Sequence, residues 1–258
     1  MRKILLTSVG VAALAVSANA TDFTLSGTAK VKVMDDGNTS VDVSTAVGVS
    51  KTFDNGMVLS LSNNNMANAG ELTITSDAVA ITFGDFDQNE KAPGLNGNAA
   101  TSDISSDGIA HSSDAGGISL GATVAGMGIG AAMNNQGDTM FGGSFATDMG
   151  GMAVTIGGDV YSDDNSSKDQ TTMGISAGLG ALTLVAHSKQ VEAAAGTDTV
   201  SYSAAYTTGG LVIGFQGDDN DKSSYSATYT VVPGMQFEIG SNDNGSVSTS
   251  SAELQMTF

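Results

Sequence analysis

The sequence predicts an all-β protein, a transmembrane antiparallel up-and-down β-barrel of about 16 strands. Three observations predict this fold. Apolar and polar residues alternate with a period of two wherever strands can be tested. Short turns alternate with longer polar connections, as in membrane barrels. Gly makes up 34 of 258 residues and Pro only 2, a composition that destabilises long helices and suits strands and turns.

The first twenty residues have the pattern of a signal peptide. Arg2 and Lys3 form a basic start, an apolar stretch of about 13 residues follows, and Ala18-Asn19-Ala20 supplies the small residues of a cleavage site. A membrane-spanning helix needs about 20 apolar residues, so this stretch is too short for an anchor. We therefore expect residues 1–20 to be cleaved and residues 21–258 to form a single barrel domain.

The exported chain is strongly acidic. Cleavage removes the only Arg and one Lys, which leaves 7 Lys against 27 acidic residues and lowers the formal net charge from −18 to −20. Nucleic acid is excluded as a partner because phosphate binding needs a basic face. The absence of Cys excludes disulfides and Cys-based zinc sites. Interactions other than disulfides and Cys-bound zinc must therefore hold the fold together.

The first predicted strand, residues 23–34, shows the alternation clearly. Its odd-numbered residues are mostly apolar, whereas Thr, Ser, Lys30 and Lys32 occupy the even positions. In a membrane barrel the polar face lines the lumen, so Lys30 and Lys32 are candidate pore-lining residues. A soluble sandwich would show the same alternation, which alone does not decide between the two folds.

Seven short turns rich in Gly and Asp separate the predicted hairpins. They lie at residues 53–56, 75–78, 114–117, 148–151, 178–180, 208–210 and 232–234. Residues 118–124 leave two alternatives open: they end a hairpin that begins near Ile109, or they begin one that turns at residues 126–128. The uncharged stretch 115–133 is long enough for a membrane helix, but its many Gly residues argue against one.

No pattern in the chain predicts catalysis. His111 stands beside two Ser residues, and His187 is the only other His, without the base and orienting acid that a nucleophile needs. We therefore expect no enzyme activity and no cofactor. The acidic segments 163–165, 218–221 and 242–245 offer oxygen ligands for Ca²⁺, but none has the spaced loop with a distal Glu. Loop-bound Ca²⁺ stays an alternative.

Three segments carry a resemblance to a known family. Residues 23–30, 80–87 and 251–258 resemble the first strand, the strand before the third loop and the C-terminal strand of Gram-negative general porins, in their alphaproteobacterial form. In that family the barrel-assembly machinery recognises the last strand, so the resemblance implies an assembly signal here, formed by Leu254, Met256 and Phe258.

The resemblance implies a homotrimeric, water-filled barrel in outer-membrane lipid, through which small hydrophilic solutes and ions diffuse passively. The family's third loop folds inward and narrows the pore, and the matching candidate constriction loop is residues 87–107. The candidate constriction residues are Asp87, Glu90, Asp103 and Asp107. The family's opposing wall is mostly Arg, which this exported chain lacks, so Lys30 and Lys32 take that place. The acidic charge predicts cation selectivity.

A second class of function stays open. The chain could be a secreted, acidic, β-rich surface or adhesive protein that divalent cations stabilise. The two classes differ in how the protein is extracted: a membrane barrel needs detergent, whereas a chelator such as EDTA releases a cation-stabilised surface protein.

Overall fold

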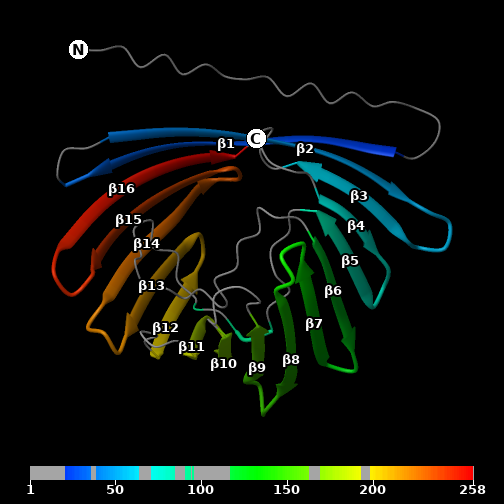
Figure 1. The fold of residues 1–258 in the computed structure, drawn as a ribbon. Helices are drawn as coiled ribbons and strands as arrows, with labels where there is room; N and C mark the ends of the chain where they lie inside the picture. The colour runs from blue at the N-terminus through cyan, green and yellow to red at the C-terminus, as the bar shows by residue number, and fades with distance from the viewer. Residues whose placement is uncertain are drawn as a thin grey trace.

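The computed structural model describes residues 21–35, 39–63, 71–84, 91–93, 95, 117–162, 169–192 and 198–257. In these residues sixteen strands close into one antiparallel barrel (Figure 1). Each strand pairs with its sequence neighbours, and β1 closes the ring against β16. The predicted all-β, up-and-down barrel of about 16 strands is confirmed. The predicted signal peptide, residues 1–20, lies outside the described residues.

The strands differ in length around the ring. The first eight are β1 (Thr21–Met34), β2 (Thr39–Thr52), β3 (Val58–Asn63), β4 (Glu71–Thr75), β5 (Val79–Gly84), β6 (Gly117–Val124), β7 (Met127–Asn134) and β8 (Thr139–Asp148). The other eight are β9 (Ala153–Ser162), β10 (Asp169–Leu179), β11 (Leu182–Glu192), β12 (Thr199–Thr208), β13 (Leu211–Asp218), β14 (Ser223–Val232), β15 (Met235–Asp243) and β16 (Ser248–Thr257). Among the described residues no helix is long and apolar enough to cross a membrane.

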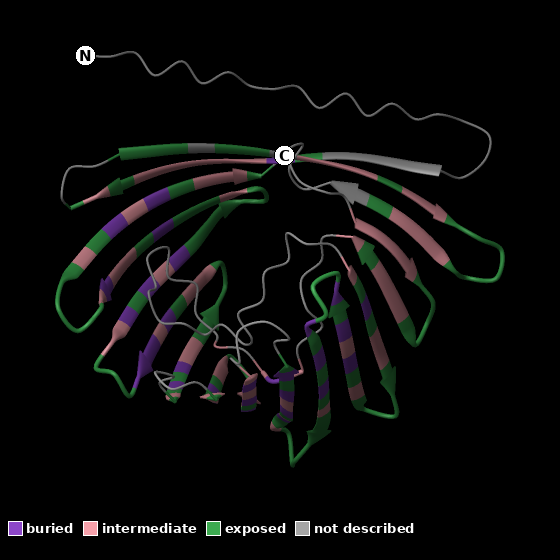
Figure 2. Cartoon of the chain, viewed as in Figure 1, coloured by how far each residue is buried: buried purple, intermediate pink, exposed green. Residues whose placement is uncertain are grey.

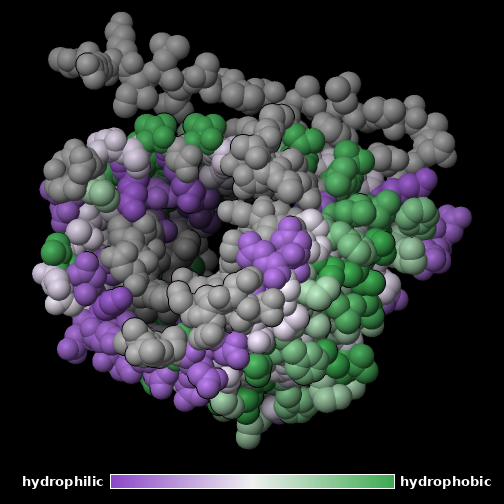
Figure 3. Space-filling view, viewed as in Figure 1, coloured by the Kyte–Doolittle hydropathy of each residue, from purple (hydrophilic) through white to green (hydrophobic). Residues whose placement is uncertain are grey.

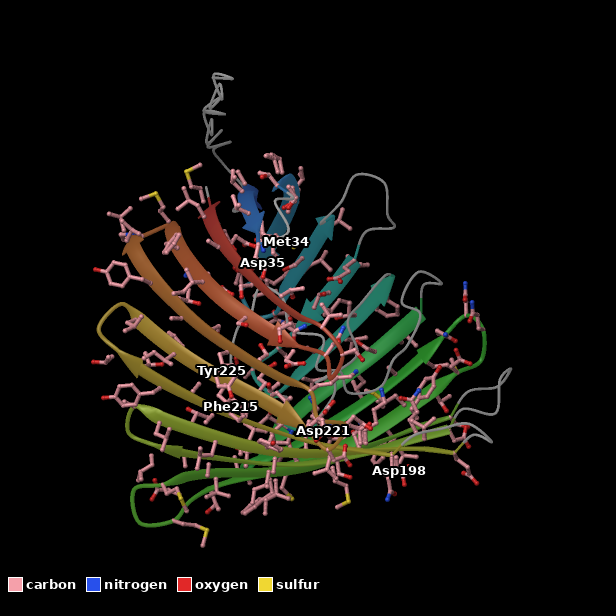
Figure 4. The ribbon with its side chains drawn as sticks, turned by 90° about the vertical axis from the view of Figure 1, so that its left-hand side faces the viewer. Met34, Asp35, Asp198, Phe215, Asp221 and Tyr225 are labelled. Carbon is pink, nitrogen blue, oxygen red and sulfur yellow. The ribbon has the colours of Figure 1, made fainter. Side chains whose placement is uncertain are left out.

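The two ends of the barrel carry different connections. Seven short turns lie at one end, at residues 53–57, 76–78, 125–126, 149–152, 180–181, 209–210 and 233–234. The other connections leave their strands at the opposite end, where Asp198 and Asp221 are found (Figure 4). Six of the seven predicted short turns thus lie within a residue or two of their expected positions.

The hairpin β6–β7 decides between the two alternatives for residues 117–134. It turns at Ala125 and Gly126, whose φ angles are 52° and 80°, as a two-residue type I′ turn requires. The second alternative is therefore confirmed, although the turn precedes the predicted residues 126–128, because Met127 and Gly128 already pair in β7. Of the helix considered for residues 115–133, the described residues 117–133 instead form β6, its turn and β7.

Of the short turn predicted at residues 114–117, the structure describes only Gly117, and there the prediction is wrong; residues 114–116 lie outside the described residues. Strand β5 pairs directly with β6, so residues 85–116 form one long connection between them. Gly117 belongs to β6 and pairs with Gly84 and Asn134. A Cβ on Gly117 would collide with the carbonyl oxygen of Met133. Gly117 therefore allows β6 and β7 to approach closely. Composition alone does not distinguish a glycine in this role from one in a turn.

The two faces of the barrel wall are chemically opposite. Buried and exposed positions alternate along the strands (Figure 2). The exposed positions include large apolar side chains such as Phe141, Ile156, Met173, Leu184 and Ile239, whereas the buried polar positions include Ser119, Asp159, Thr172, Ser201 and Ser224. In the space-filling view, hydrophobic residues gather on the outer wall and hydrophilic residues border an opening (Figure 3). The alternation thus produces an apolar exterior and a polar interior.

Candidate pore and the segment that enters it

Part of the β5–β6 connection lies inside the barrel, against β9 and β10. The backbone amide of Lys91 donates to both carboxylate oxygens of Asp159, at 2.8 and 3.0 Å. The next amide, of Ala92, donates to Asp159 Oδ2 at 2.7 Å. Asp159 is only 2% exposed and Ala92 only 9%. Residues 91–93 of the third long connection therefore lie inside the barrel, as expected for the inward-folded third loop that the resemblance implies.

A hydroxyl completes the surroundings of the Asp159 carboxylate. Thr172, which stands opposite Asp159 on β10, donates from Oγ1 to Asp159 Oδ2 at 3.3 Å. Thr172 is fully buried. Hydrogen bonds to an ionised acceptor are about twice as strong as neutral ones. The Asp159 carboxylate is thus a strong hydrogen-bond acceptor held in the wall, and the successive amides of Lys91 and Ala92 donate to it.

The wall behind this segment lacks side chains at three positions, Gly142, Gly157 and Gly174, which we call the glycine recess. A Cβ on Gly157 would collide with the carbonyl oxygen of Lys91, and one on Gly174 would lie 2.9 Å from the carbonyl oxygen of Pro93. A Cβ on Gly142 would collide with the Asp159 carboxylate. The backbone of residues 91–93 therefore lies directly against the strands.

The polar face that holds this segment continues around the barrel to the predicted pore lysines. Residues paired directly across strands share a face. Thr228, Glu238, Glu253 and Lys32 form one such row across β14, β15, β16 and β1. Two residues along β1, Lys30 Nζ lies 3.5 Å from Glu253 Oε1. The lysines of β1 are thus accompanied by two carboxylates of the neighbouring strands.

Lys30 and Lys32 lie on the side of the lumen opposite residues 91–93, which we call the docked segment. In the closed ring of sixteen strands, β1 and β9 are eight positions apart, which is half the circumference. Figure 1 shows β1 and β9 on opposite sides of the ring. Residues 91–93 therefore lie against the β9 side of the lumen, across from β1 and β16. That Lys30 and Lys32 line the narrow part of a pore stays a prediction.

The other predicted residues fall in different places. Asp87, Glu90, Asp103, Asp107 and Phe258 lie outside the described residues, so their roles stay predictions. The outer face of β16 carries the remaining two, opposite apolar partners of β15: Leu254 pairs with Phe237, and Met256 with Met235.

Sequence reasoning missed three acids of the inner wall, Asp159, Glu238 and Glu253. The alternation could have placed them on the inner wall, because each is an acid at a polar-face position of an alternating strand. What a strand sequence does not reveal is which distant segment of the chain contacts these acids inside the barrel. The contact of Asp159 with Lys91 joins residues 68 positions apart in the chain.

Several acids of the predicted Ca²⁺ segments form the turns that contain them. Asp218 Oδ1 accepts hydrogen bonds from the amides of Asn220 and Lys222, at 2.9 and 3.0 Å. Asp243 Oδ1 accepts one from the amide of Gly245 at 2.9 Å. Within the described ranges no three or more His, Asp or Glu side chains gather as a metal site. Loop-bound Ca²⁺ stays an untested alternative, and residues 163–165 lie outside those ranges.

Solved structures similar to this chain are porins of Rhodopseudomonas blastica. One mutant of that porin covers 92% of this chain and 100% of its own, with a TM-score of 0.68 and 14% identity. A triple mutant of the same porin matches with a TM-score of 0.69, 12% identity and the same coverage. No protein-family model matches the sequence, and no curated protein matches it. At these identities the likeness establishes the fold, which is that of the porin barrel.

Proposed function

We propose that this chain is an outer-membrane porin. After export and cleavage of residues 1–20, it forms a water-filled channel for the passive diffusion of small hydrophilic solutes, with a preference for cations. The observation that carries the proposal is a closed sixteen-strand barrel whose polar interior receives a segment of the third long connection. The homotrimer and the assembly machinery are part of the proposal through the resemblance to the porin family.

The exterior supports a position in lipid. A closed barrel pairs its strand edges, and in lipid open edges are not tolerated. Large apolar side chains on the outer face, among them Phe141, Val160 and Met173, are more than half exposed, a surface that soluble monomers avoid. Phe145, Tyr206 and Tyr229 lie exposed near the short-turn end, as in the aromatic girdle of a membrane interface.

The interior supports a water-filled path. Barrels of 16 to 18 strands are wide enough to leave an aqueous channel. The polar face is built from Ser, Thr, Gln, Asp and Glu. Since the docked segment occupies the β9 side, the space toward β1 and β16 is the proposed path for solutes.

The balance of charge supports cation preference. On the described wall, Lys30 is paired with Glu253, and Glu238 stands directly opposite Glu253. At the end with the longer connections, Asp198, Asp219 and Asp221 add negative charge. Acidic residues around a water-filled path raise the local cation concentration and repel anions.

Single-channel recording tests the proposal. The protein, purified and folded in detergent, is added to planar bilayers at 1 M KCl, and discrete, ohmic conductance steps are expected. A boiled sample is the control. Folded protein that inserts without conducting would instead be a closed structural barrel. Release from cells by EDTA without detergent would favour the cation-stabilised surface protein.

A further inference from the structure

We infer that Asp159 and the glycine recess form a latch that holds the third long connection against β9 and β10 and thereby sets the aperture of the channel. The aperture rests on the proposed function, whereas the latch is a property of the fold. In this assignment Asp159 is a positioning residue. It acts through the backbone of residues 91–93, which it holds away from the β1 side of the lumen.

The carboxylate accounts for one half of the latch. It accepts two successive loop amides and one wall hydroxyl while it is almost completely buried. An asparagine at the same place keeps the size but offers one acceptor oxygen and directs an NH₂ group toward the amides. Because an amide donor facing another donor loses its hydrogen bond, Asp159→Asn weakens the hold on Lys91 or on Ala92.

The glycine recess accounts for the other half, independently of charge. Pro93 lies against Gly174, with its carbonyl oxygen 2.9 Å and its Cδ 3.0 Å from the place a Cβ would take. The aliphatic stem of Lys91 lies 3.6 Å from the corresponding place at Gly128 on β7. The segment therefore rests on three strands, and a methyl group in the recess lifts its backbone off the wall.

The chain provides a direct reporter of release. Lys91 is the only Lys or Arg among residues 85–116, so trypsin cuts this connection only after Lys91. Proteases need an accessible, flexible backbone, and the hydrogen-bonded, half-buried Lys91 does not offer one. Cleavage between Lys91 and Ala92, identified by the mass of the fragments, measures how often the segment leaves the wall, and it requires no conductance.

The experiment compares Asp159→Asn, Gly157→Ala and Gly174→Ala with the wild type. Two glycines of the same strands serve as matched controls. Gly143→Ala on β8 and Gly178→Ala on β10 add a Cβ whose nearest neighbours lie 3.8 Å away, an ordinary contact. All variants are folded in detergent, and different migration of unboiled and boiled samples in SDS gels verifies the folded barrel.

We expect Asp159→Asn to be cut after Lys91 at least about tenfold faster than the wild type, since losing a hydrogen bond to a charged group corresponds to about that factor in released population. Gly157→Ala and Gly174→Ala should also be cut faster than the wild type, because the added methyl group displaces the backbone at Lys91 or Pro93. All three latch variants should show a higher and noisier single-channel conductance, whereas both controls should match the wild type. If one latch variant does not fold, the others decide.

Three results would overturn the inference. Equal cleavage of the latch variants and the wild type would show that the segment is not held by these residues. Rapid cleavage of folded wild type after Lys91 would show the same without any variant. Faster cleavage with unchanged conductance would remove the link to the aperture. If no sample conducts but the cleavage pattern is as expected, the porin function fails while the latch stands.

Discussion

Lys30 and Glu253 show how a single contact modifies the charge of the inner wall. The lysine side chain is 43% exposed and the glutamate 11%, with 3.5 Å between Nζ and Oε1. Glu238 stands directly opposite Glu253, and like charges in that arrangement repel each other. Lys30 therefore offsets part of the negative charge of this pair, and its own positive charge is correspondingly less able to attract anions.

Replacing Lys30 by Gln should strengthen cation preference, because it removes a positive charge that lies 3.5 Å from Glu253 and so makes the inner wall more negative. Glu253→Gln should weaken it. A pair with one half-exposed partner contributes at most about 1 kcal/mol to stability, so both variants should fold. The measurement is the reversal potential across a KCl gradient. Lys51→Gln is the control, since Lys51 lies 5.5 Å from the Phe53 ring near the short-turn end. A shift in the control as large as that of Lys30→Gln would contradict a local effect.

At the scale of single elements, the β6–β7 hairpin carries a local conflict. Its turn requires positive φ at both central residues, yet the first is Ala125, at 52°. The left-handed region costs a residue with a Cβ roughly 1–2 kcal/mol. The flanking pairs Val124–Met127 and Thr123–Gly128 close the hairpin around it. Their pairing imposes the conformation on Ala125.

Ala125→Gly should therefore raise the free energy of unfolding by about 1 kcal/mol, because glycine adopts this φ without steric cost. Urea unfolding in detergent, followed by circular dichroism, measures the change. Ala122→Gly, in β6 and without positive φ, is the control and should destabilise by about 0.5–1 kcal/mol. If both substitutions destabilise equally, the turn conformation is not under strain.

The last strand is the second element with a testable role. β16 pairs with β15 on one side and with β1 on the other, so the barrel closes through it. Leu254 and Met256 lie on its outer face, and the alternation predicts Phe258 on the same face. Deleting Phe258 should lower the yield in the outer membrane and leave chain in the periplasm, as measured by fractionation. Thr257→Ala is the control, and a normal yield of the deletion would argue against an assembly signal.

At the scale of the whole molecule, the barrel could be predicted because the alternation of apolar and polar residues within each strand identifies its outer and inner faces. Residues 23–34 alone show which side chains share a face. The short turns along the chain then indicate where successive hairpins turn. The latch could not be predicted in the same way. In the sequence, Asp159 looks like any other residue of a polar strand face. Only the closed barrel shows that the amides of Lys91 and Ala92 bind it. The wrong assignment of Gly117 to a turn has a similar cause, because this glycine allows two strands to approach closely and does not form a bend.

The net charge of −20 proposed for residues 21–258 leads to a prediction about salt. Screening reduces the reach of fixed charges from about 10 Å at 0.1 M salt to about 3 Å at 1 M. A channel that owes its selectivity to acidic walls and loops should therefore prefer K⁺ over Cl⁻ strongly at 0.1 M and weakly at 1 M. Selectivity set by pore width alone would vary little over this range.

Reversal potentials at both salt concentrations, measured at a fixed ratio across the bilayer, test this dependence. Neutralising Asp103 and Asp107 together should reduce the preference at 0.1 M and leave the value at 1 M almost unchanged, because screening already suppresses their field there. The matched control neutralises Asp54 and Asp77, which lie in short turns between strands. An anion-selective wild type would contradict the role assigned to the acidic charge. An equal effect of the two double variants would show that overall charge, rather than the predicted constriction, determines selectivity.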